Sequence, residues 1–391
     1  FMLDAIYGVG YKLEAVNPLL QKTANLINNY QRAKTVIAID CPSGVDNDTG
    51  NALQNPIRAT YTLAMGFPKL GNFFFPTRAF LGMLMVANLN YEFKDVQEYL
   101  KSKLYFIDNI KNFFPGRALN GSKYDHGCVI NIAGSRDMLG AAILSSKAIY
   151  KAGAGLVYTY TQEAQALLSN CPETIVKPLQ DLSAQEILSN QKVDCISIGP
   201  GLGADHNELV YDLVAQSTKP LILDADAINA FVGKTDLLKK HQTEIVITPH
   251  FGEYKRLFPE DIKETFTPSS VIEAIKKRAK ELDITIVLKG SPTLIADPCG
   301  EVFILPYGNS GLASAGTGDV LTGLIAGFLA QSLRRKNKYL ANSKLITQNA
   351  ILAVYVHAKT AELIAPEKTE YAMTASDILD NLHRSIKFSL N

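Results

Sequence analysis

Three features are scarce in this sequence, and each scarcity excludes a class of protein. The 391 residues include five cysteines, an odd number scattered without a C-x-x-C pair, so neither a disulfide framework nor a zinc site is expected. The formal net charge of +1 provides no electrostatic surface for nucleic acid or an anionic membrane. No apolar run reaches the roughly 18 residues of a membrane span. This cysteine usage favours a reducing, cytoplasmic location.

The composition is that of an ordinary globular protein. Hydrophobic residues make up 47% and charged residues 20%, which is enough material for a large core. The length suggests two domains, which we place at residues 1–105 and 106–391, with a charged and aromatic linker region around their boundary. Strand-like and helix-like segments alternate along the chain. This alternation predicts an α/β protein with a mostly parallel sheet that is covered on both faces.

The most informative stretch is NSGLASAGTGDVLTGLIAGFLAQSL, residues 309–333. Small residues fill its first half, and the run from Val320 to Leu333 is apolar enough for a buried helix. A small-residue loop that opens into a helix exposes unpaired N–H groups at the positive end of the helix dipole, where a phosphate binds well. Asp319 stands at this junction. It is either a general base beside the phosphate or an ordinary N-terminal capping residue.

The first hundred residues contain a strand, a glycine turn, a helix and a second strand. Such a βαβ unit places ligands at the carboxyl ends of its strands. Asp4, Asp40 and Ser43 would lie at that edge, where their oxygens could hold a hard cation or a ribose hydroxyl. Taken singly, each of them is as well explained as a turn residue that bonds its own backbone.

Three ordered segments carry a resemblance here: DAIYGVGYK, DCPSGVD and GFPKLG, which start at residues 4, 40 and 66. They resemble the second half of the epimerase domain, a Rossmann-like α/β domain, of NAD(P)H-hydrate repair enzymes. The resemblance implies that Asp4 and Ser43 bind K⁺. It also implies that the hydrated nicotinamide nucleotide is contacted by Gly8, Val9, Gly10, Tyr11, Lys12, Leu13, Glu14 and Asp40.

The sequence departs from that family in two places. Leu13 stands where the family usually has a small residue. The Asn-Asn-Gly-Gly-Asp segment that lies upstream in such epimerases does not occur in these 391 residues, and Phe1 begins at what reads as the end of a strand. We therefore expect the true N-terminus to lie upstream, and the epimerase site to be incomplete within these residues.

Five further segments occur in one order: AGSRDMLGAA, GPGLG, TPHFGE, KGSPT and NSGLASAGTGDVL, starting at residues 133, 199, 248, 289 and 309. Taken alone, the glycine-rich segments are tight turns, and a lone histidine is more often structural than functional. Together they resemble the ADP- or ATP-dependent NAD(P)H-hydrate dehydratases, a branch of the ribokinase-like αβα fold. The match covers roughly residues 110–391.

The second resemblance implies roles for individual residues. The adenine nucleotide, with Mg²⁺, would be bound by Lys289, Gly290, Ser291, Pro292, Thr293 and Gly318. The hydrated nicotinamide nucleotide would be contacted by Ala141, Gly203, His250 and Asp319. Asp319 would take the proton of the ring hydroxyl as that oxygen attacks the terminal phosphoryl group, because phosphate is a better leaving group than hydroxide. A symmetric homo-oligomer is also expected.

Two rival functions fit parts of the pattern. A small-molecule kinase of the same fold, acting on a sugar or vitamin precursor, would share the GTGD loop but would not need an epimerase-like domain. A nucleotide-binding protein without turnover is the second rival: the intact set of Lys289, Gly318 and Asp319 argues against it for the second domain, and it stays open for the first. Neither the choice between ADP and ATP nor the oligomeric state follows from the residues.

Overall fold

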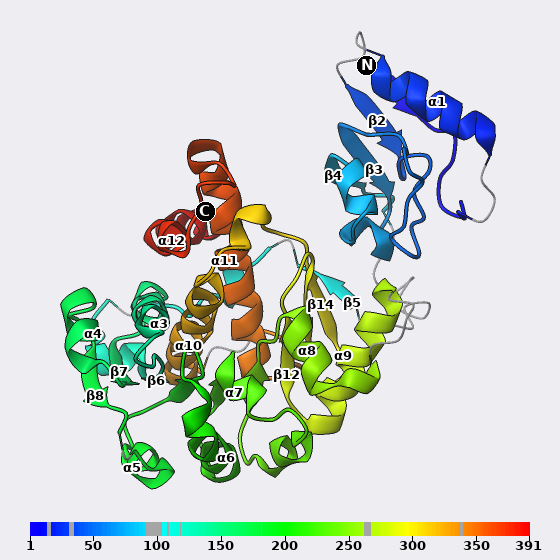
Figure 1. Ribbon diagram of the computed structural model, residues 1–391. Coiled ribbons are helices and arrows are strands. Elements are labelled where there is room, and N and C mark those ends of the chain that lie inside the picture. Colours follow the sequence, from blue (N-terminus) through cyan, green and yellow to red (C-terminus); the bar gives the residue numbers. More distant parts are fainter. Residues whose placement is uncertain are drawn as a thin grey trace. The chain divides into compact units, whose positions relative to one another are not determined.

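The computed structural model describes residues 1–13, 17–30, 35–90, 104–107, 109–117, 119–180, 182–261, 267–336 and 339–391. The chain forms two compact units, which are described separately below (Figure 1). Unit 1 comprises residues 1–103 with 263–273, and unit 2 comprises residues 104–262 with 274–391. Glu14, which was predicted to contact the substrate, and most of the expected linker lie outside the described residues.

Unit 1 is built on a four-stranded sheet in the order β1-β2-β3-β4, in which every neighbouring pair is parallel. The strands are β1 (Met2–Asp4), β2 (Val36–Ile39), β3 (Tyr61–Met65) and β4 (Met83–Ala87). Helix α1 (Pro18–Asn29) connects β1 to β2. It starts at a proline behind the capping side chain of Asn17 and buries Leu20 and Ala24, a spacing that lies on one helical face. β4 has no counterpart among the strands that the sequence predicted.

Unit 2 contains a ten-stranded sheet in the order β5-β14-β13-β12-β11-β10-β9-β6-β7-β8. β13 pairs antiparallel with both β12 and β14, and the other neighbouring pairs are parallel. The predicted mostly parallel sheet is therefore confirmed. The strands are β5 (Leu104–Phe106), β6 (Cys128–Ile132), β7 (Leu156–Thr161), β8 (Ile175–Pro178), β9 (Cys195–Ile198), β10 (Leu221–Leu223), β11 (Ile245–Ile247), β12 (Thr285–Leu288), β13 (Thr293–Ala296) and β14 (Val302–Leu305).

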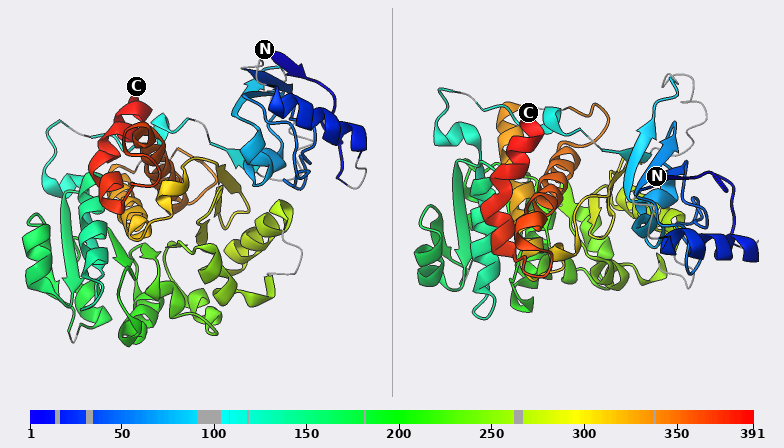
Figure 2. Two further views of the ribbon diagram at one scale, coloured as in Figure 1. Left: turned by 45° about the horizontal axis from the view of Figure 1, so that its top comes forward. Right: turned by 90° about the horizontal axis from the view of Figure 1, so that it is seen from above.

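Helices cover both faces of this sheet (Figure 2). One face packs against α10 and α11, with α3 and α12 beside them, around a continuous apolar core. α10 is buried along most of its length because its sequence is almost uncharged. The helices of unit 2 are α3 (Leu139–Lys151), α4 (Ala164–Asn170), α5 (Ala184–Ser189), α6 (Asn207–Gln216), α7 (Asp226–Asn229), α8 (Phe251–Leu257), α10 (Thr317–Arg335), α11 (Leu345–Lys368), α12 (Ala375–Leu390) and the part of α9 (Pro268–Leu282) from residue 274 onward.

The register of the parallel strands brings distant motifs to one edge of unit 2. Leu223 of β10 is aligned with the last residues of both β9 and β11. The residues that directly follow these strands therefore meet at the carboxyl edge, which is where α/β sheets bind ligands. The GPGLG, DAD and TPHFGE segments start there, and the first turn of α10 reaches the same edge through its contact with Asp224.

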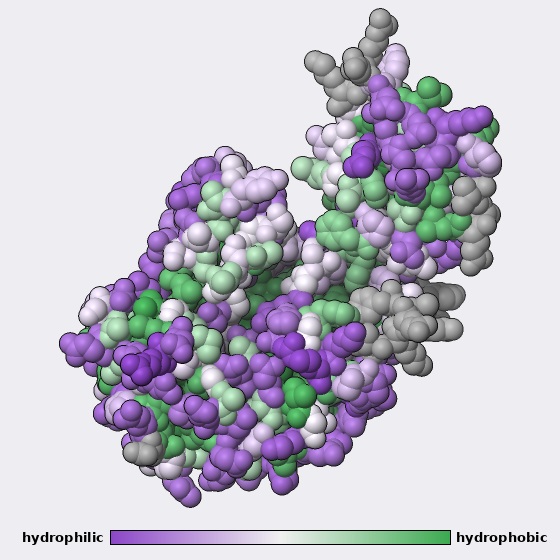
Figure 3. Space-filling model, in the orientation of Figure 1, coloured by the Kyte–Doolittle hydropathy of each residue, from purple (hydrophilic) through white to green (hydrophobic). Residues whose placement is uncertain are grey.

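The surface in Figure 3 is mostly hydrophilic, with hydrophobic residues scattered over both units. All five cysteines are free, and four of them are buried. Among the described residues, no helix has both the length and the apolar character needed to cross a bilayer.

Candidate active sites

The glycine-rich segment before α10 forms an open loop, which we call the anion loop (residues 314–319). Gly316 occupies the capping position with φ of 87°, a left-handed conformation that suits glycine. The Thr317 hydroxyl donates to the carbonyl of Leu312 (2.8 Å), and the Ser314 hydroxyl to that of Met373 (3.0 Å). Within the described residues, the N–H groups of Ala315, Gly316, Gly318 and Asp319 donate no hydrogen bond. The loop is thus fixed by side chains, while its amides stay available for an anion.

Asp319 lies in the first turn of α10 and is half-buried. Burial, followed by the negative charges of Asp224 and Asp226, raises its pKa to about 7 against the opposing effect of Lys289, which lowers it. A carboxyl group that titrates near neutral pH can both accept and return a proton under physiological conditions. The side chain is therefore neither sealed in the interior nor a merely exposed cap.

The cation nearest the anion loop is Lys289, which directly follows β12. Its Nζ donates to Asp224 Oδ1 (3.0 Å), lies 3.9 Å from Glu253 Oε2, and would be 3.5 Å from a Cβ on Gly318. Burial lowers the pKa of Lys289, but these two carboxylates outweigh burial and leave it raised. The ammonium is therefore charged and next to the open amides, where it can contact a phosphate.

His250 caps the start of α8 and forms an isolated parallel β-bridge with Lys289, the residue after β12. Its Nδ1 accepts hydrogen bonds from the backbone N–H groups of Gly252 (2.9 Å) and Glu253 (3.3 Å), and its ring is about half exposed. Because Nδ1 accepts, the neutral ring carries its proton on Nε2. His250 therefore presents a hydrogen-bond donor to the carboxyl edge of the sheet.

The segments that contain Ala141 and Gly203 are bonded to each other. Gly134 and Ser135 donate their backbone N–H groups to the carbonyls of Pro200 (2.9 Å) and Gly201 (2.6 Å). The N–H of Gly203 donates to Asp226 Oδ2 (2.8 Å), and Asp226 is one of the charges that raise the pKa of Asp319. The segments of Ala141 and Gly203 are therefore bonded to each other, and Gly203 is bonded to an aspartate whose charge acts on the predicted base.

The remaining predicted nucleotide-binding residues form the turn between β12 and β13. The backbone N–H of Lys289 donates to the carbonyl of Pro249 (2.8 Å), and the Thr293 hydroxyl to that of Gly290 (3.1 Å). Ser291 and Pro292 are joined by a cis peptide. This turn thus lies beside the TPHFGE segment and continues directly from the lysine at the anion loop.

Sequence reasoning missed three acidic residues of this site. Asp224, Asp226 and Glu253 were quoted only as parts of turns, yet they contact Lys289, Gly203 and His250. The available signal was the DAD triplet directly after a buried strand, because two carboxylates at a carboxyl edge are unusual without a charged partner.

In unit 1, Asp4 and Ser43 lie together and are 1% exposed each. Asp4 accepts the Ser43 backbone N–H (2.7 Å) and hydroxyl (2.6 Å), and Ser43 Oγ also accepts the N–H of Tyr7 (3.0 Å). The oxygens are of the kind that hard cations prefer, but they are bonded to each other. Within the described residues, no group of three or more histidine, cysteine or acidic side chains has a geometry that could hold a metal ion.

Asp40 follows β2 with φ of 70°, which turns its carboxylate toward the Gly8 loop. The carboxylate accepts the N–H groups of Val9 (3.2 Å) and Met65 (3.3 Å) and the ammonium of Lys69 (2.6 Å). The structure therefore brings Asp40 to the predicted loop of residues 8–14, and adds Lys69 as its charged partner.

The other described residues of that loop each have different surroundings. Gly10 has φ of 99°, Tyr11 is buried against Tyr7, and Lys12 forms an ion pair with Asp48. Leu13 is half-buried.

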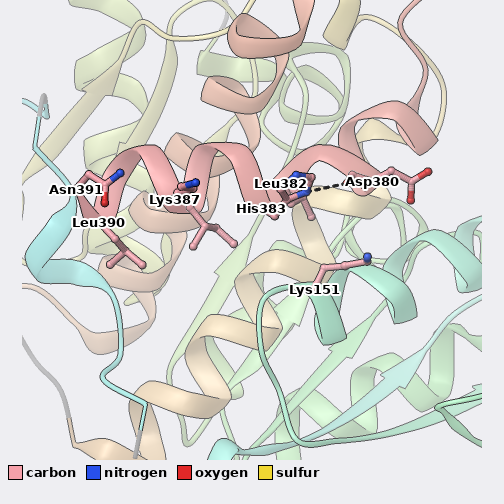
Figure 4. A pocket seen from close by; sticks show the side chains of 8 residues that line it. Lys151, Asp380, Leu382, His383, Lys387, Leu390 and Asn391 are labelled. Atoms are coloured by element: carbon pink, nitrogen blue, oxygen red, sulfur yellow. Dashed lines mark hydrogen bonds between the residues drawn. The ribbon is translucent and has the colours of Figure 1, made fainter.

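A separate cavity of about 390 Å³ lies on α12 (Figure 4). Its lining consists of Lys151, Asp380, Leu382, His383, Ile386, Lys387, Leu390 and Asn391. None of the residues predicted for either site lines it, so this cavity gives no support to the predicted chemistry.

Comparison with known proteins decides the family. Residues 129–384 match the family model described as NAD(P)H-hydrate dehydratase, and residues 1–71 match that of the YjeF-related protein N-terminus. The bifunctional NAD(P)H-hydrate repair enzyme Nnr of Moorella thermoacetica is 33% identical, over 97% of this chain and 72% of that protein. The chain belongs to the bifunctional NAD(P)H-hydrate repair enzymes. The enzyme of the same name from Dictyoglomus turgidum is 32% identical, over 98% of this chain and 74% of its own length.

A solved structure supports the fold of unit 2. The ADP/ATP-dependent NAD(P)H-hydrate dehydratase of Bacillus subtilis, co-crystallised with ATP/Mg²⁺, is 27% identical with a TM-score of 0.59, and the match covers 72% of this chain and 96% of that one. The predicted α/β class, with a ribokinase-like fold after a Rossmann-like part, is confirmed. These relatives favour the repair function over the small-molecule kinase alternative, so the chain is an NAD(P)H-hydrate dehydratase and epimerase that acts on a small molecule with an adenine nucleotide.

Proposed function

We propose that residues 106–391 dehydrate the (S)-hydrate of NADH and NADPH by phosphorylating its ring hydroxyl, with Asp319 as the general base. The observation that carries this proposal is the position of Lys289 at the start of α10, where its Nζ would lie 3.5 Å from a Cβ on Gly318, next to loop amides that bond nothing within the described part of the chain and to the Asp319 carboxyl, whose pKa is raised to about 7. A base, an anion cradle and a cation in one place are what phosphoryl transfer requires.

The reaction would proceed in two steps. In the first, Asp319 takes the hydroxyl proton while the hydroxyl oxygen forms a bond to the terminal phosphorus and the bond from that phosphorus to the nucleotide breaks. The free N–H groups of the anion loop and the Lys289 ammonium stabilise the charge on the transferred group. In the second, the lone pair of the ring nitrogen expels phosphate, and loss of a proton from the neighbouring carbon restores the double bond.

Different residues are proposed to bind the adenine nucleotide and the hydrate. We assign Lys289, Gly290, Ser291, Pro292, Thr293 and Gly318 to the adenine nucleotide, and Ala141, Gly203 and His250 to the hydrate, with His250 donating from Nε2. Either ADP or ATP can supply the phosphoryl group, because both present the same terminal group to the loop. Mg²⁺ would arrive with the nucleotide phosphates, the usual mode for an ion that rarely uses an all-protein cage.

We further propose that residues 1–105 interconvert the two epimers of the hydrate, so that the second domain can use both. Asp40 and residues 8–14 (Gly8, Val9, Gly10, Tyr11, Lys12, Leu13 and Glu14) would contact the nucleotide. Asp4 and Ser43 would hold K⁺ through their adjacent oxygens, in place of the hydrogen bond that now joins them. The enzyme would work in the cytoplasm, as a homo-oligomer.

Incubation of the protein with purified (S)-hydrate and ADP or ATP tests the main proposal. NADH absorbance should return with stoichiometric release of inorganic phosphate. Accumulation of a stable phosphate ester without the return of absorbance would instead identify a kinase, and binding of both nucleotides without either product would identify a binding protein.

A further inference from the structure

Asp224, at the end of β10, is the most completely bonded side chain of the dehydratase site. It is 2% exposed and accepts hydrogen bonds from the hydroxyls of Thr248 (2.6 Å) and Thr322 (2.8 Å) and from Lys289 Nζ (3.0 Å). These partners come from three elements: the end of β11, helix α10 and the end of β12. A buried carboxylate with three donors from separate elements is rigidly held.

Two of these bonds connect Asp224 to the proposed chemistry. Lys289 is the cation beside the anion loop. Thr322 lies in α10 one turn after Gly318, to whose carbonyl its hydroxyl is also close (3.1 Å). Asp224 therefore joins the lysine and the helix that carries Asp319, one turn after the anion loop. The negative charge of Asp224 is also, after burial, the second cause of the raised pKa of Asp319.

We propose that Asp224 is a positioning residue of the dehydratase, which holds the Lys289 ammonium beside the anion loop and, through Thr322, fixes the helix that carries Asp319. This inference rests on the proposed role of Asp319 as the base. Asp224 does not need to touch the substrate, because it acts through Lys289 and through its electric field.

The charges around Asp319 support this role. Asp224 and Asp226 raise the pKa of Asp319, and Lys289 lowers it. Lys289 is itself engaged by Asp224 and by Glu253, which lies on α8. His357 on α11 lies near Lys289, but burial lowers its pKa to about 4, so it adds no charge near neutral pH. Because Asp224 both repels Asp319 and occupies its cation, both effects of Asp224 increase the affinity of Asp319 for a proton.

The test compares the pH dependence of kcat/KM for dehydration in the wild-type protein and two variants. Replacing Asp224 by asparagine (D224N) keeps the shape and one acceptor but removes the charge, so the acid limb should move to lower pH, by on the order of one unit. Lys289→Met removes the opposing cation, so its limb should move to higher pH. The matched control is Asp297→Asn. Asp297 is another fully buried carboxylate of unit 2 with a threonine donor, and its variant should keep the wild-type midpoint.

Opposite displacements in the two site variants, with none in the control, support the inference. Unmoved midpoints in D224N and Lys289→Met, while Asp319→Asn abolishes turnover, overturn the inference and leave the proposed function intact. Full turnover in Asp319→Asn overturns the proposed function itself. If D224N fails to fold, the direction of the Lys289→Met displacement still decides: a midpoint that stays or falls contradicts the inference.

Discussion

Each unit contains a lysine–carboxylate pair at the carboxyl edge of its sheet, but the two pairs leave different groups available for chemistry. In unit 1, Lys69 binds Asp40, the residue expected to contact the substrate. In unit 2, Lys289 binds Asp224, a residue with no expected contact, and Asp319 stands beside this pair without a hydrogen bond to the lysine. Burial is the largest cause of the raised pKa of Asp319, the charges of Asp224 and Asp226 add to it, and Lys289 only partly offsets them. Unit 2 thus obtains a base with a pKa of about 7 from common residues.

The largest expected effect is the loss of dehydration rate when Asp319, the proposed base of unit 2, is replaced. Asp319→Asn keeps the size of the side chain but cannot accept the proton, so dehydration should fall by roughly two to four orders of magnitude. Asp377→Asn is the matched control, because Asp377 occupies the corresponding first-turn position of α12. That variant should keep the dehydration rate. Comparable rates for the two variants would mean that Asp319 is only a cap.

Replacement of Asp40 in unit 1 should affect epimerisation of the hydrate and not its dehydration. Asp40→Asn removes a charged residue that is proposed to contact the nucleotide, so it should slow conversion of the (R)-hydrate into the (S)-hydrate by about tenfold, the effect of losing roughly 1.4 kcal/mol of binding. Dehydration of purified (S)-hydrate should be unchanged. The measurement is chiral chromatography of the hydrates with and without the nucleotide. A parallel loss of both activities would contradict the assignment of separate reactions to the two sites.

The two lysines should differ in their contribution to stability. In Lys289→Met, Asp224 keeps the Thr248 and Thr322 hydroxyls but loses its only ion-pair partner among the described residues at 2% exposure, and removing one partner of a buried ion pair typically costs about 3 kcal/mol or more. In Lys69→Met, Asp40 keeps two backbone donors and is less buried, with 13% side-chain exposure, so the loss should be nearer about 1 kcal/mol. Urea unfolding of both variants checks the ranking. Equal losses in the free energy of unfolding would show that the deeper burial of Asp224 does not determine the cost of removing its lysine partner.

The raised pKa of Asp319 also predicts how stability depends on pH. The folded pKa of about 7 lies above the ordinary aspartate pKa of about 4, so between these values the folded state binds a proton that the unfolded state releases, and the stability due to Asp319 is lost as pH rises toward 7. The full shift corresponds to about 4 kcal/mol, which the partial exposure of the group reduces to on the order of 2 kcal/mol.

Asp319→Asn should therefore stabilise the protein near about pH 8 by on the order of 2 kcal/mol, and by less than half as much near about pH 5. Thermal unfolding at the two pH values provides the check. A variant that is destabilised at both would mean that Asp319 is ionised and favourably bonded in the folded state.

The smallest predicted effect concerns the glycine of the anion loop. A Cβ on Gly318 would stand 3.5 Å from Lys289 Nζ, in the space that the phosphate needs, while alanine within α10 favours the helix by about 0.5–1 kcal/mol. Gly318→Ala should thus raise the KM for the nucleotide about tenfold and slightly raise the Tm. In Gly8→Ala of unit 1, where the new Cβ would be 3.5 Å from Asp40 Oδ2, dehydration should be unaffected.

Local patterns carried most of what the sequence could predict. The small residues before the apolar run of α10 marked an anion loop, because helix start and glycine conformation depend on neighbours in sequence. The alternation of short β-branched runs with amphipathic segments marked the parallel sheet for the same reason. β13 was missed because the tight turn at residues 289–293 leaves only four residues for an antiparallel strand.

The connection between Lys289, Asp224 and Asp319 could not be predicted in the same way. Asp224 is bonded to residues 24, 65 and 98 positions further along the chain, and no local pattern encodes such contacts. Only the register of β10 with its neighbours brings these partners together. The raised pKa of Asp319 follows from that arrangement together with burial, so it too required the tertiary structure.

The pH dependence of kcat/KM for dehydration of the (S)-hydrate tests the central claim most directly. A base with a pKa of about 7 predicts a rate that falls about tenfold per pH unit below a midpoint near 7, and this limb should vanish from the residual activity of Asp319→Asn. A midpoint near the ordinary carboxyl value of about 4, or an unchanged limb in the variant, would contradict the account.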